Sequence, residues 1–374
     1  MGRSPLTLAA FATNALEGSE FTSVRPLTSE GSGDFDSVIL TTDTDQTLVF
    51  RVPRTPEAAR KADDEATVLS ALSAGVRARL PFEVPTLVGH TEVGNTTARL
   101  YEYIPGSTLR SRALKGSGQL CSAVGGAIAA IHSIPSSVVT DFDLPARSAI
   151  EVAAGIATTV DRARGTGRLP DPVARRWDAA LAADPLWEFT PTVVHGDLSE
   201  ASFSVADAEV TGVFGWSAFG LGDPAVDLAW VIDLPAIGFD ISEAYLIARR
   251  DEADACIRQR ALLHRELDLA RWLLYGVDTG DASTVDDGAR MLRALAADIE
   301  RGAAAPLVPS ETQEPTPLQE PAAAAEPGYP DPNDVPDTPS VTEEPNPDLS
   351  AEPGAQPSTA SPAPEEAADE NTSV

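Results

Sequence analysis

The stretch that decides the fold lies in the second half of the chain. Residues 194–227 read VHGDLSEASFSVADAEVTGVFGWSAFGLGDPAVD. The stretch opens on His195-Gly196-Asp197 and closes on Gly222-Asp223-Pro224-Ala225-Val226-Asp227. Between these blocks, Phe203–Val205 and Val210–Phe214 are short apolar, β-branched runs around a turn, which is typical of a β-hairpin. Two Asp-containing loops therefore flank one hairpin, and we expect a functional site there.

The residues before this stretch begin with a β-rich part. The predicted strands are Asp36–Thr42, Gln46–Val52, Thr86–His90 and Ala98–Ile104. Between the second and third strands, Lys61–Leu72 has apolar residues at helical spacing. Pro105-Gly106 then interrupts the pattern, as expected of a loop. These features predict a small β-rich lobe over residues 1–104, with an opening helix at Leu6–Ala12.

Residues 105–301 follow a helical pattern. Apolar residues recur at intervals of four, four and three in the run Leu120, Val124, Ile128 and Ile131. This spacing places them on one face of a helix, and Ala149–Ala163 and Ser242–Tyr275 have a similar pattern. Thr192–Val194 joins the hairpin in one small β region. The chain is therefore predicted to be an α+β protein with two lobes and a cleft between them.

The last fifth of the chain differs in composition. Gly302–Val374 holds 16 of the 31 prolines and 15 acidic residues, but no Lys or Arg. Its only aromatic residue is Tyr329, so it has little apolar surface to bury, and we expect residues 302–374 to be disordered. Such a tail either keeps the protein soluble or recruits a protein partner, and both alternatives stay open.

The charge of the chain excludes some classes of partner. The net charge is −30, and residues 1–301 still hold 42 acidic against 27 basic residues. Nucleic acids and anionic membranes are bound by clustered Lys and Arg, so neither is an expected partner. No apolar run approaches the about 20 residues that cross a bilayer. The two cysteines, Cys121 and Cys256, form no CxxC pair, which favours a cytoplasmic protein.

The blocks around the hairpin resemble those of the aminoglycoside and macrolide phosphotransferase family, which are small-molecule kinases with the protein-kinase fold. That family has a catalytic loop of HGD, four residues and Asn, then a strand ending in Asp-Trp, then GDPxxDLA. The order and spacing of these blocks are retained here. The resemblance covers roughly Leu16–Arg301. It implies a protein-kinase-like fold and transfer of a nucleotide γ-phosphate to a hydroxyl of a small molecule.

The resemblance also implies a set of site residues. Those implied for nucleotide binding are Gly31 and Gly33 of a phosphate loop, Arg51 as the phosphate-binding cation, Glu65 as its partner, and Glu102, Tyr103 and Ile104 of the hinge. The phosphate donor would be ATP or GTP. Asp197 would be the catalytic residue, which accepts the proton of the acceptor hydroxyl or orients that hydroxyl.

The chain departs from the family at both metal-ligand positions. Ser202 replaces the Asn of the catalytic loop, and Gly215 replaces the Asp that ends the hairpin strand. Magnesium prefers oxygen ligands, and a carboxylate is its principal anchor, so the resemblance assigns no metal ligand and leaves magnesium in doubt. Magnesium stabilises several kcal/mol of developing charge, and about 1.4 kcal/mol is a tenfold change in rate. Catalysis is therefore predicted to be severely reduced or lost.

Two interpretations stay open at this point. The first is a pseudokinase-like binding protein, and the second is an active small-molecule kinase that takes its metal ligands from elsewhere and has a small-molecule acceptor. The acids nearest in sequence, Asp207 and Glu209, are predicted at the hairpin tip, away from the cleft. Asp34 and Asp36 of the phosphate loop could reach a metal, but they are interpreted as residues that structure the loop. Five other residues are predicted to be structural: His132, His195, Trp216, Asp227 and Trp230.

Overall fold

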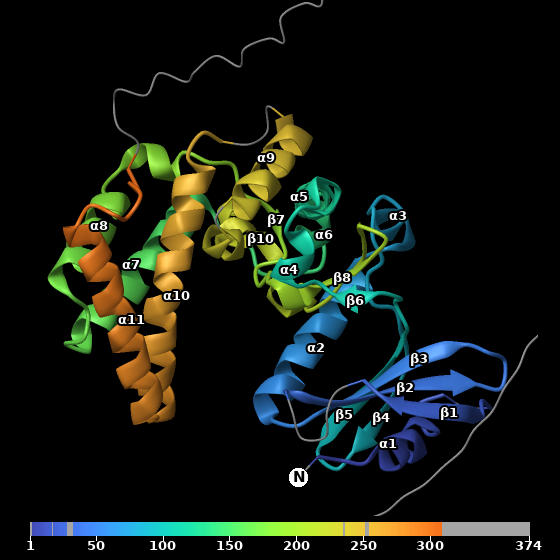
Figure 1. The fold of residues 1–374 in the computed structure, drawn as a ribbon. Coiled ribbons are helices and arrows are strands. Elements are labelled where there is room, and N and C mark those ends of the chain that lie inside the picture. Colours follow the sequence, from blue (N-terminus) through green and yellow to red (C-terminus); the bar gives the residue numbers. More distant parts are fainter. Residues whose placement is uncertain (1, 17, 28–32, 235, 251–253, 309–374) are drawn as a thin grey trace, which may run out of the picture. The chain divides into compact units, whose positions relative to one another are not determined.

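The computed structural model describes residues 2–16, 18–27, 33–234, 236–250 and 254–308 (Figure 1). They include every helix and strand given below. Of the tail predicted over residues 302–374, the part from residue 309 onward lies outside the described residues, as does Gly31 of the predicted phosphate loop.

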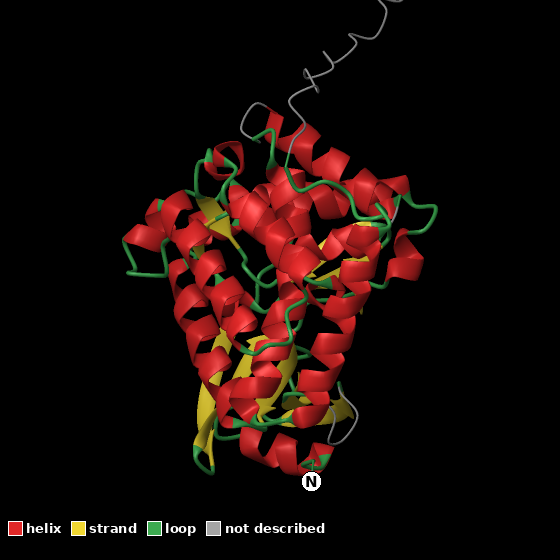
Figure 2. Cartoon of the chain, turned by 90° about the vertical axis from the view of Figure 1, so that its left-hand side faces the viewer, coloured by secondary structure: helices red, strands yellow, loops and turns green. Residues whose placement is uncertain are grey.

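The first lobe is built on a five-stranded antiparallel sheet with the order β1-β2-β3-β5-β4. Its strands are β1 (Phe21–Pro26), β2 (Phe35–Thr42), β3 (Thr47–Pro53), β4 (Leu87–Val93) and β5 (Thr96–Glu102). The four predicted strands correspond to β2–β5. β1 was not predicted, because it is an edge strand in which no residue is fully buried. Figure 2 shows the sheet in yellow near the N-terminus.

The two faces of this sheet have different roles. Phe50 of β3 is fully buried in an apolar cluster with Leu8 and Ala12 of α1 (Pro5–Ala12). Successive side chains of a strand point to opposite faces, so Arg51 points to the other face. That face carries α2 (Pro56–Ala71), the helix that holds Glu65.

Helix α2 begins five residues before the predicted start at Lys61. Thr55 caps it, because its hydroxyl accepts a hydrogen bond from the N–H of Ala58 at 3.1 Å, and Pro56 occupies the first turn. Proline fits the first turn because the N–H it lacks has no partner within the helix. The longer helix places Lys61 within α2 rather than at its start.

The second lobe is mainly helical. Its long helices are α5 (Gly118–His132), α7 (Ala149–Gly165), α8 (Asp171–Leu181), α9 (Ile237–Arg249), α10 (Ile257–Thr279) and α11 (Ala282–Glu300). The helical pattern over Ser242–Tyr275 is therefore divided between α9 and α10. Arg250 after α9 has a φ of 48°, which a continuing helix does not allow. Within the described part of the chain, no helix has the length and apolar composition of a membrane span.

Several shorter elements connect these helices. The short helices are α3 (Ala74–Arg77), α4 (Ser111–Leu114) and α6 (Ser137–Thr140), and single turns of tighter helix span Asp184–Trp187, Glu200–Ser202 and Trp216–Ala218. A longer segment of the same tight type runs over Pro224–Asp233, directly after Asp223.

The predicted hairpin consists of β8 (Phe203–Ala206) and β9 (Glu209–Val213). Asp207 and Ala208 both have positive φ, as a two-residue hairpin turn requires, and β6 (Ser107–Thr108) pairs with β8. The expectation of one β region that includes Thr192–Val194 was wrong. That segment, β7, pairs instead with β10 (Gly220–Gly222), whose Gly-Leu-Gly sequence carries almost no strand signal.

Candidate functional site

A cavity of about 390 Å³ lies where β5 leaves the sheet for the second lobe. Five of the residues predicted to bind a nucleotide line it: Gly33, Arg51, Glu102, Tyr103 and Ile104. Val49 of the sheet and Phe203 and Phe214 of the second lobe add apolar walls. A flat ring would be enclosed by these apolar side chains and would face the polar backbone of residues 102–104.

Local contacts hold the segment Glu102–Ile104, the predicted hinge, in place. The N–H of Glu102 donates to the Thr86 carbonyl at 3.0 Å, and the N–H of Tyr103 donates to the Thr47 carbonyl at 3.1 Å. These bonds use two backbone donors of the hinge within the first lobe. A bound base would therefore be read by the remaining polar groups of the hinge, among them the N–H of Ile104.

The predicted pair of Arg51 and Glu65 is present. Nη1 of Arg51 lies 3.8 Å from Oε2 of Glu65, and the guanidinium carbon lies 4.0 Å from the centre of the Phe35 ring. Glu65 is buried, whereas the Arg51 side chain keeps 29% of its surface exposed. The pair is thus a loose ion pair that leaves most of the five Arg51 donors open to the cavity.

Glu65 makes a second contact that the sequence did not indicate. Its Oε1 accepts hydrogen bonds from the backbone N–H of Gly215 at 3.1 Å and of Trp216 at 3.2 Å. One carboxylate therefore joins the sheet cation to the segment after the hairpin. No sequence signal marks this contact, because the partners are backbone groups and lie about 150 residues away.

The predicted catalytic loop is fixed by Asp227. Its carboxylate accepts hydrogen bonds from the N–H of His195 at 2.7 Å and of Gly196 at 2.8 Å. Burial alone would raise the pKa of Asp227, but the hydrogen bond from His132 and the nearby His195 hold that pKa below its usual range. Asp227 therefore stays ionised and acts as the anchor of the loop.

The two histidines of the site also support the loop. Nε2 of His132 donates to Asp227 at 3.1 Å, and its Nδ1 accepts from the Tyr245 hydroxyl at 2.9 Å. His195 donates from Nε2 to the Phe214 carbonyl at 3.0 Å. Burial lowers the pKa of His195, so the ring is neutral. These contacts agree with the structural roles predicted for both residues.

Asp197 follows this anchored pair and opens to the cleft. The surrounding walls desolvate its carboxyl and raise its pKa, while the positive charge of Lys61 acts in the opposite direction. It lines two cavities, one of about 540 Å³ in the second lobe and one of about 280 Å³ beside α2. Asp197 thus borders both cavities, as expected of a carboxylate that faces a phosphate donor on one side and an acceptor hydroxyl on the other.

The residues around the hairpin do not fit a magnesium ion. The Ser202 hydroxyl accepts from the N–H of Ser199 at 3.1 Å, and Gly215, with a φ of 85°, brings no side chain. Glu65 is already engaged with two N–H groups. Among the described residues, no three His, Cys, Asp or Glu side chains come together as a metal site. The donor set is therefore short of the anchoring carboxylate.

Of the four alternative acids, Asp34 lines the cavity of about 390 Å³, whereas the other three are committed elsewhere. Asp207 lies in the hairpin turn, and Glu209 accepts from the Gln119 side chain at 2.8 Å, as predicted for the hairpin tip. Asp36 forms ion pairs with Arg3 at 3.0 Å and with Arg54 at 3.6 Å. None of these acids lines the cavity of about 280 Å³ beside α2.

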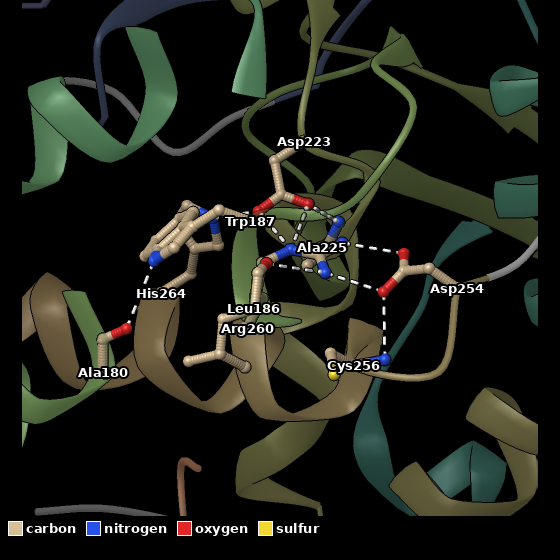
Figure 3. A network of polar contacts seen from close by, with 9 residues as sticks. All are labelled: Ala180, Leu186, Trp187, Asp223, Ala225, Asp254, Cys256, Arg260 and His264. Atoms are coloured by element: carbon tan, nitrogen blue, oxygen red, sulfur yellow. Dashed lines mark hydrogen bonds and ion pairs between the residues drawn. The ribbon is translucent and has the colours of Figure 1, made fainter. Parts of the chain in front are cut away.

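The closing block of the decisive stretch is anchored to α10 (Figure 3). The Asp223 carboxylate accepts from Nε of Arg260 at 2.9 Å and from Nε2 of His264 at 3.0 Å. Burial would raise the pKa of Asp223, but His264 and Arg260 lower it to about 2. Asp254 binds the other end of the Arg260 guanidinium at 2.7 Å. This buried network holds the Asp223–Asp227 segment on which the catalytic loop depends.

The cavity of about 540 Å³ adds residues that the sequence did not single out. Along α10, His264, Asp268 and Arg271 line it at intervals of four and three residues, so they share one face of the helix. Arg147 and Trp230 also line this cavity. The charged groups of this cavity have both signs, so it is suited to a polar acceptor.

A β-rich lobe, a hinge and an Asp-bearing loop held by a second Asp define a protein of the kinase-like phosphotransferase class. The sequence model of the phosphotransferase enzyme family, APH, matches residues 28–263. The chain belongs to this family. A search of curated proteins gave no significant match to the chain.

Solved structures show the same fold. Macrolide 2'-phosphotransferase MphH from Brachybacterium faecium has a TM-score of 0.65 at 22% identity, over 77% of this chain and 98% of that one. Macrolide 2'-phosphotransferase type I has a TM-score of 0.63 at 25% identity, over 78% and 98%. The GDP complex of aminoglycoside 2'-phosphotransferase-IIIa has a TM-score of 0.65 at 16% identity, over 79% and 99%. The expected two-lobed protein-kinase-like fold is confirmed.

Proposed function

We propose that this chain is a nucleotide-binding member of the phosphotransferase family in which transfer to a small-molecule hydroxyl is severely reduced or lost. The observation that carries the proposal is the pairing of a retained Asp197 with Ser202 and Gly215 in one cavity. The base is present, but the carboxylate that would anchor magnesium is absent.

The cavity at the hinge supports nucleotide binding. Its apolar walls suit a purine ring, and Arg51 lies at the end where the phosphates would extend. Solved relatives carry GDP in aminoglycoside 2'-phosphotransferase-IIIa and ADP in APH(2'')-Ib. We therefore propose ATP or GTP as the ligand of this cavity.

Weak transfer follows from the charge at the γ-phosphate. Phosphoryl transfer depends on alignment and on neutralisation of charge spread over the phosphate oxygens. A metal ion supplies several kcal/mol of that stabilisation, and about 1.4 kcal/mol is tenfold in rate. Without an anchor for the metal, Asp197 can still orient a hydroxyl, but the donor phosphate is not activated.

A second candidate is an active small-molecule kinase. It is favoured by the large cavity on the acceptor side of Asp197, with Arg147, Asp268 and Arg271 on its walls. Solved relatives include macrolide and aminoglycoside phosphotransferases, so antibiotics of those classes are the first acceptors to test. The two cysteines are free and buried, in agreement with the cytoplasmic setting that we propose.

Turnover distinguishes the two candidates. Phosphate release and transfer are measured with magnesium and ATP or GTP, with and without macrolide and aminoglycoside acceptors, for the unmodified protein and for Asp197→Ala. We expect both proteins to give the same low background. Robust turnover by the unmodified protein that Asp197→Ala abolishes would establish the active kinase instead.

A further inference from the structure

The cavity of about 280 Å³ lies beside α2, where family members are expected to hold their metal. Ser202 and Gly215 form part of its wall, and so do two cations, Arg51 and Lys61. Asp197 and Glu65 are the acids on that wall. The space thus contains positively charged side chains where the family would use magnesium.

Helix α2 places Lys61 at this cavity. Lys61 precedes Glu65 by four residues, so the two side chains share one face of the helix. Its charge acts on the Asp197 carboxyl from across the cavity. The ion-pair partner of Lys61 is Glu57 at 3.9 Å, and both side chains are about half exposed. Such an exposed ion pair is weak, so it does not hold the ammonium away from a phosphate.

Arg51 and Lys61 bring two positive charges to the wall of this cavity, which also carries the acids Glu65 and Asp197. Lysine and arginine together offer eight N–H donors for phosphate oxygens, which magnesium would otherwise coordinate.

We propose that Arg51 and Lys61 bind the nucleotide phosphates directly, in the place of a magnesium ion. This inference rests on the proposed nucleotide binding. It makes binding independent of metal, and it assigns to Lys61 a phosphate-binding role that the sequence did not indicate. The two side-chain cations neutralise the charge of the phosphates, but unlike a metal ion they offer no coordination site for the reacting oxygens. The arrangement therefore favours nucleotide binding over phosphate transfer.

The test is the affinity of the full chain for ATP and GTP in EDTA and in magnesium, with adenosine and guanosine as phosphate-free probes. The variants are Lys61→Ala and Lys61→Arg, and the matched control is Arg60→Ala, a more exposed cation that pairs with Asp64 on the same helix. A hydrogen bond to a charged group contributes about 1.5–3 kcal/mol, so Lys61→Ala should weaken nucleotide binding in EDTA by about tenfold or more.

The expected pattern has five parts. Nucleotides bind in EDTA about as tightly as in magnesium. Lys61→Ala weakens this binding, whereas Lys61→Arg keeps most of it because the positive charge is retained. Arg60→Ala changes nothing, and no variant alters nucleoside binding. Binding that requires magnesium, or a Lys61→Ala variant equal to the unmodified protein, would overturn the inference while nucleotide binding stands. If neither nucleotide binds under any condition, the proposed function fails as well.

Discussion

Glu65 of α2 accepts a hydrogen bond from the N–H of Gly215 at 3.1 Å, and this contact joins the first lobe to the segment after the hairpin. The same carboxylate faces Arg51 at 3.8 Å. Glu65 therefore holds both the cation of the sheet and the backbone of the segment that begins at Gly215.

Removing this acceptor should weaken the fold. Glu65→Ala leaves the N–H groups of Gly215 and Trp216 without their partner, and an unsatisfied buried donor costs about 1–3 kcal/mol. Glu65→Gln keeps an acceptor oxygen and should cost less. Urea unfolding measures both. Asp64→Ala, at a half-exposed neighbour, is the control and should change stability by less than about 0.5 kcal/mol. Equal stability of Glu65→Ala and the control would show that the contact contributes nothing.

Two adjacent glycines of α5 should respond in opposite ways. A Cβ on Gly125 would lie 2.6 Å from the Ile241 carbonyl oxygen and 2.8 Å from the N of Tyr245, whereas a Cβ on Gly126 would meet nothing within 4 Å. Gly125→Ala should therefore force α5 and α9 apart and destabilise the protein by about 1–3 kcal/mol. Gly126→Ala should stabilise it by about 0.5–1 kcal/mol, because alanine favours helix. Thermal unfolding of both variants measures this, and a stable Gly125→Ala would disprove the close packing.

Asp223 should make stability depend on acid pH. Its folded pKa is about 2, below the ordinary 3.8, so folding favours the ionised form. The resulting stabilisation is fully present above about pH 4 and is lost as the pH falls through the folded pKa, a change of about 2 kcal/mol. The Asp223→Asn variant has no titratable carboxyl at this position and therefore lacks this pH dependence. The difference in unfolding free energy between the two proteins should therefore shrink by that amount from about pH 5 to about pH 2, and a constant difference would contradict the assignment.

Sequence patterns predicted the parts of the fold that depend on residues close together in the sequence. The β-branched run Gln46–Val52 predicted β3, and the turn between Phe203–Val205 and Val210–Phe214 predicted the hairpin. The pair of Arg51 and Glu65 was implied by the family resemblance, and the structure contains it. The start of α2 was placed too late because Thr55 and Pro56, a cap and a first-turn proline, were not used.

Contacts between distant segments could not be predicted in this way. β10 is formed by Gly220–Gly222, whose composition gives no strand signal. It is extended because it pairs with β7. Arg260 and His264 are ordinary positions of a helical pattern until the fold brings Asp223 against them. The same holds for Lys61, because only the folded chain places it across a cavity from Asp197.

The metal dependence of nucleotide binding depends on the residues at positions 202 and 215. Gly215 has room for a side chain, since an added Cβ would approach only His195 Cε1, at 3.9 Å. Asp is one of the residues that tolerate a positive φ. Gly215→Asp with Ser202→Asn therefore restores the two residue types that the family has at its metal-ligand positions, with the φ of 85° at position 215 as the main cost to the variant.

The decisive measurement is the affinity for ATP and GTP, with and without magnesium, of the unmodified protein and of the Gly215→Asp, Ser202→Asn variant. We predict that magnesium leaves the affinity of the unmodified protein nearly unchanged. In the restored variant it should raise the affinity by about tenfold or more, which corresponds to at least about 1.4 kcal/mol. A magnesium-dependent gain of that size in the unmodified protein would contradict the loss of the metal site.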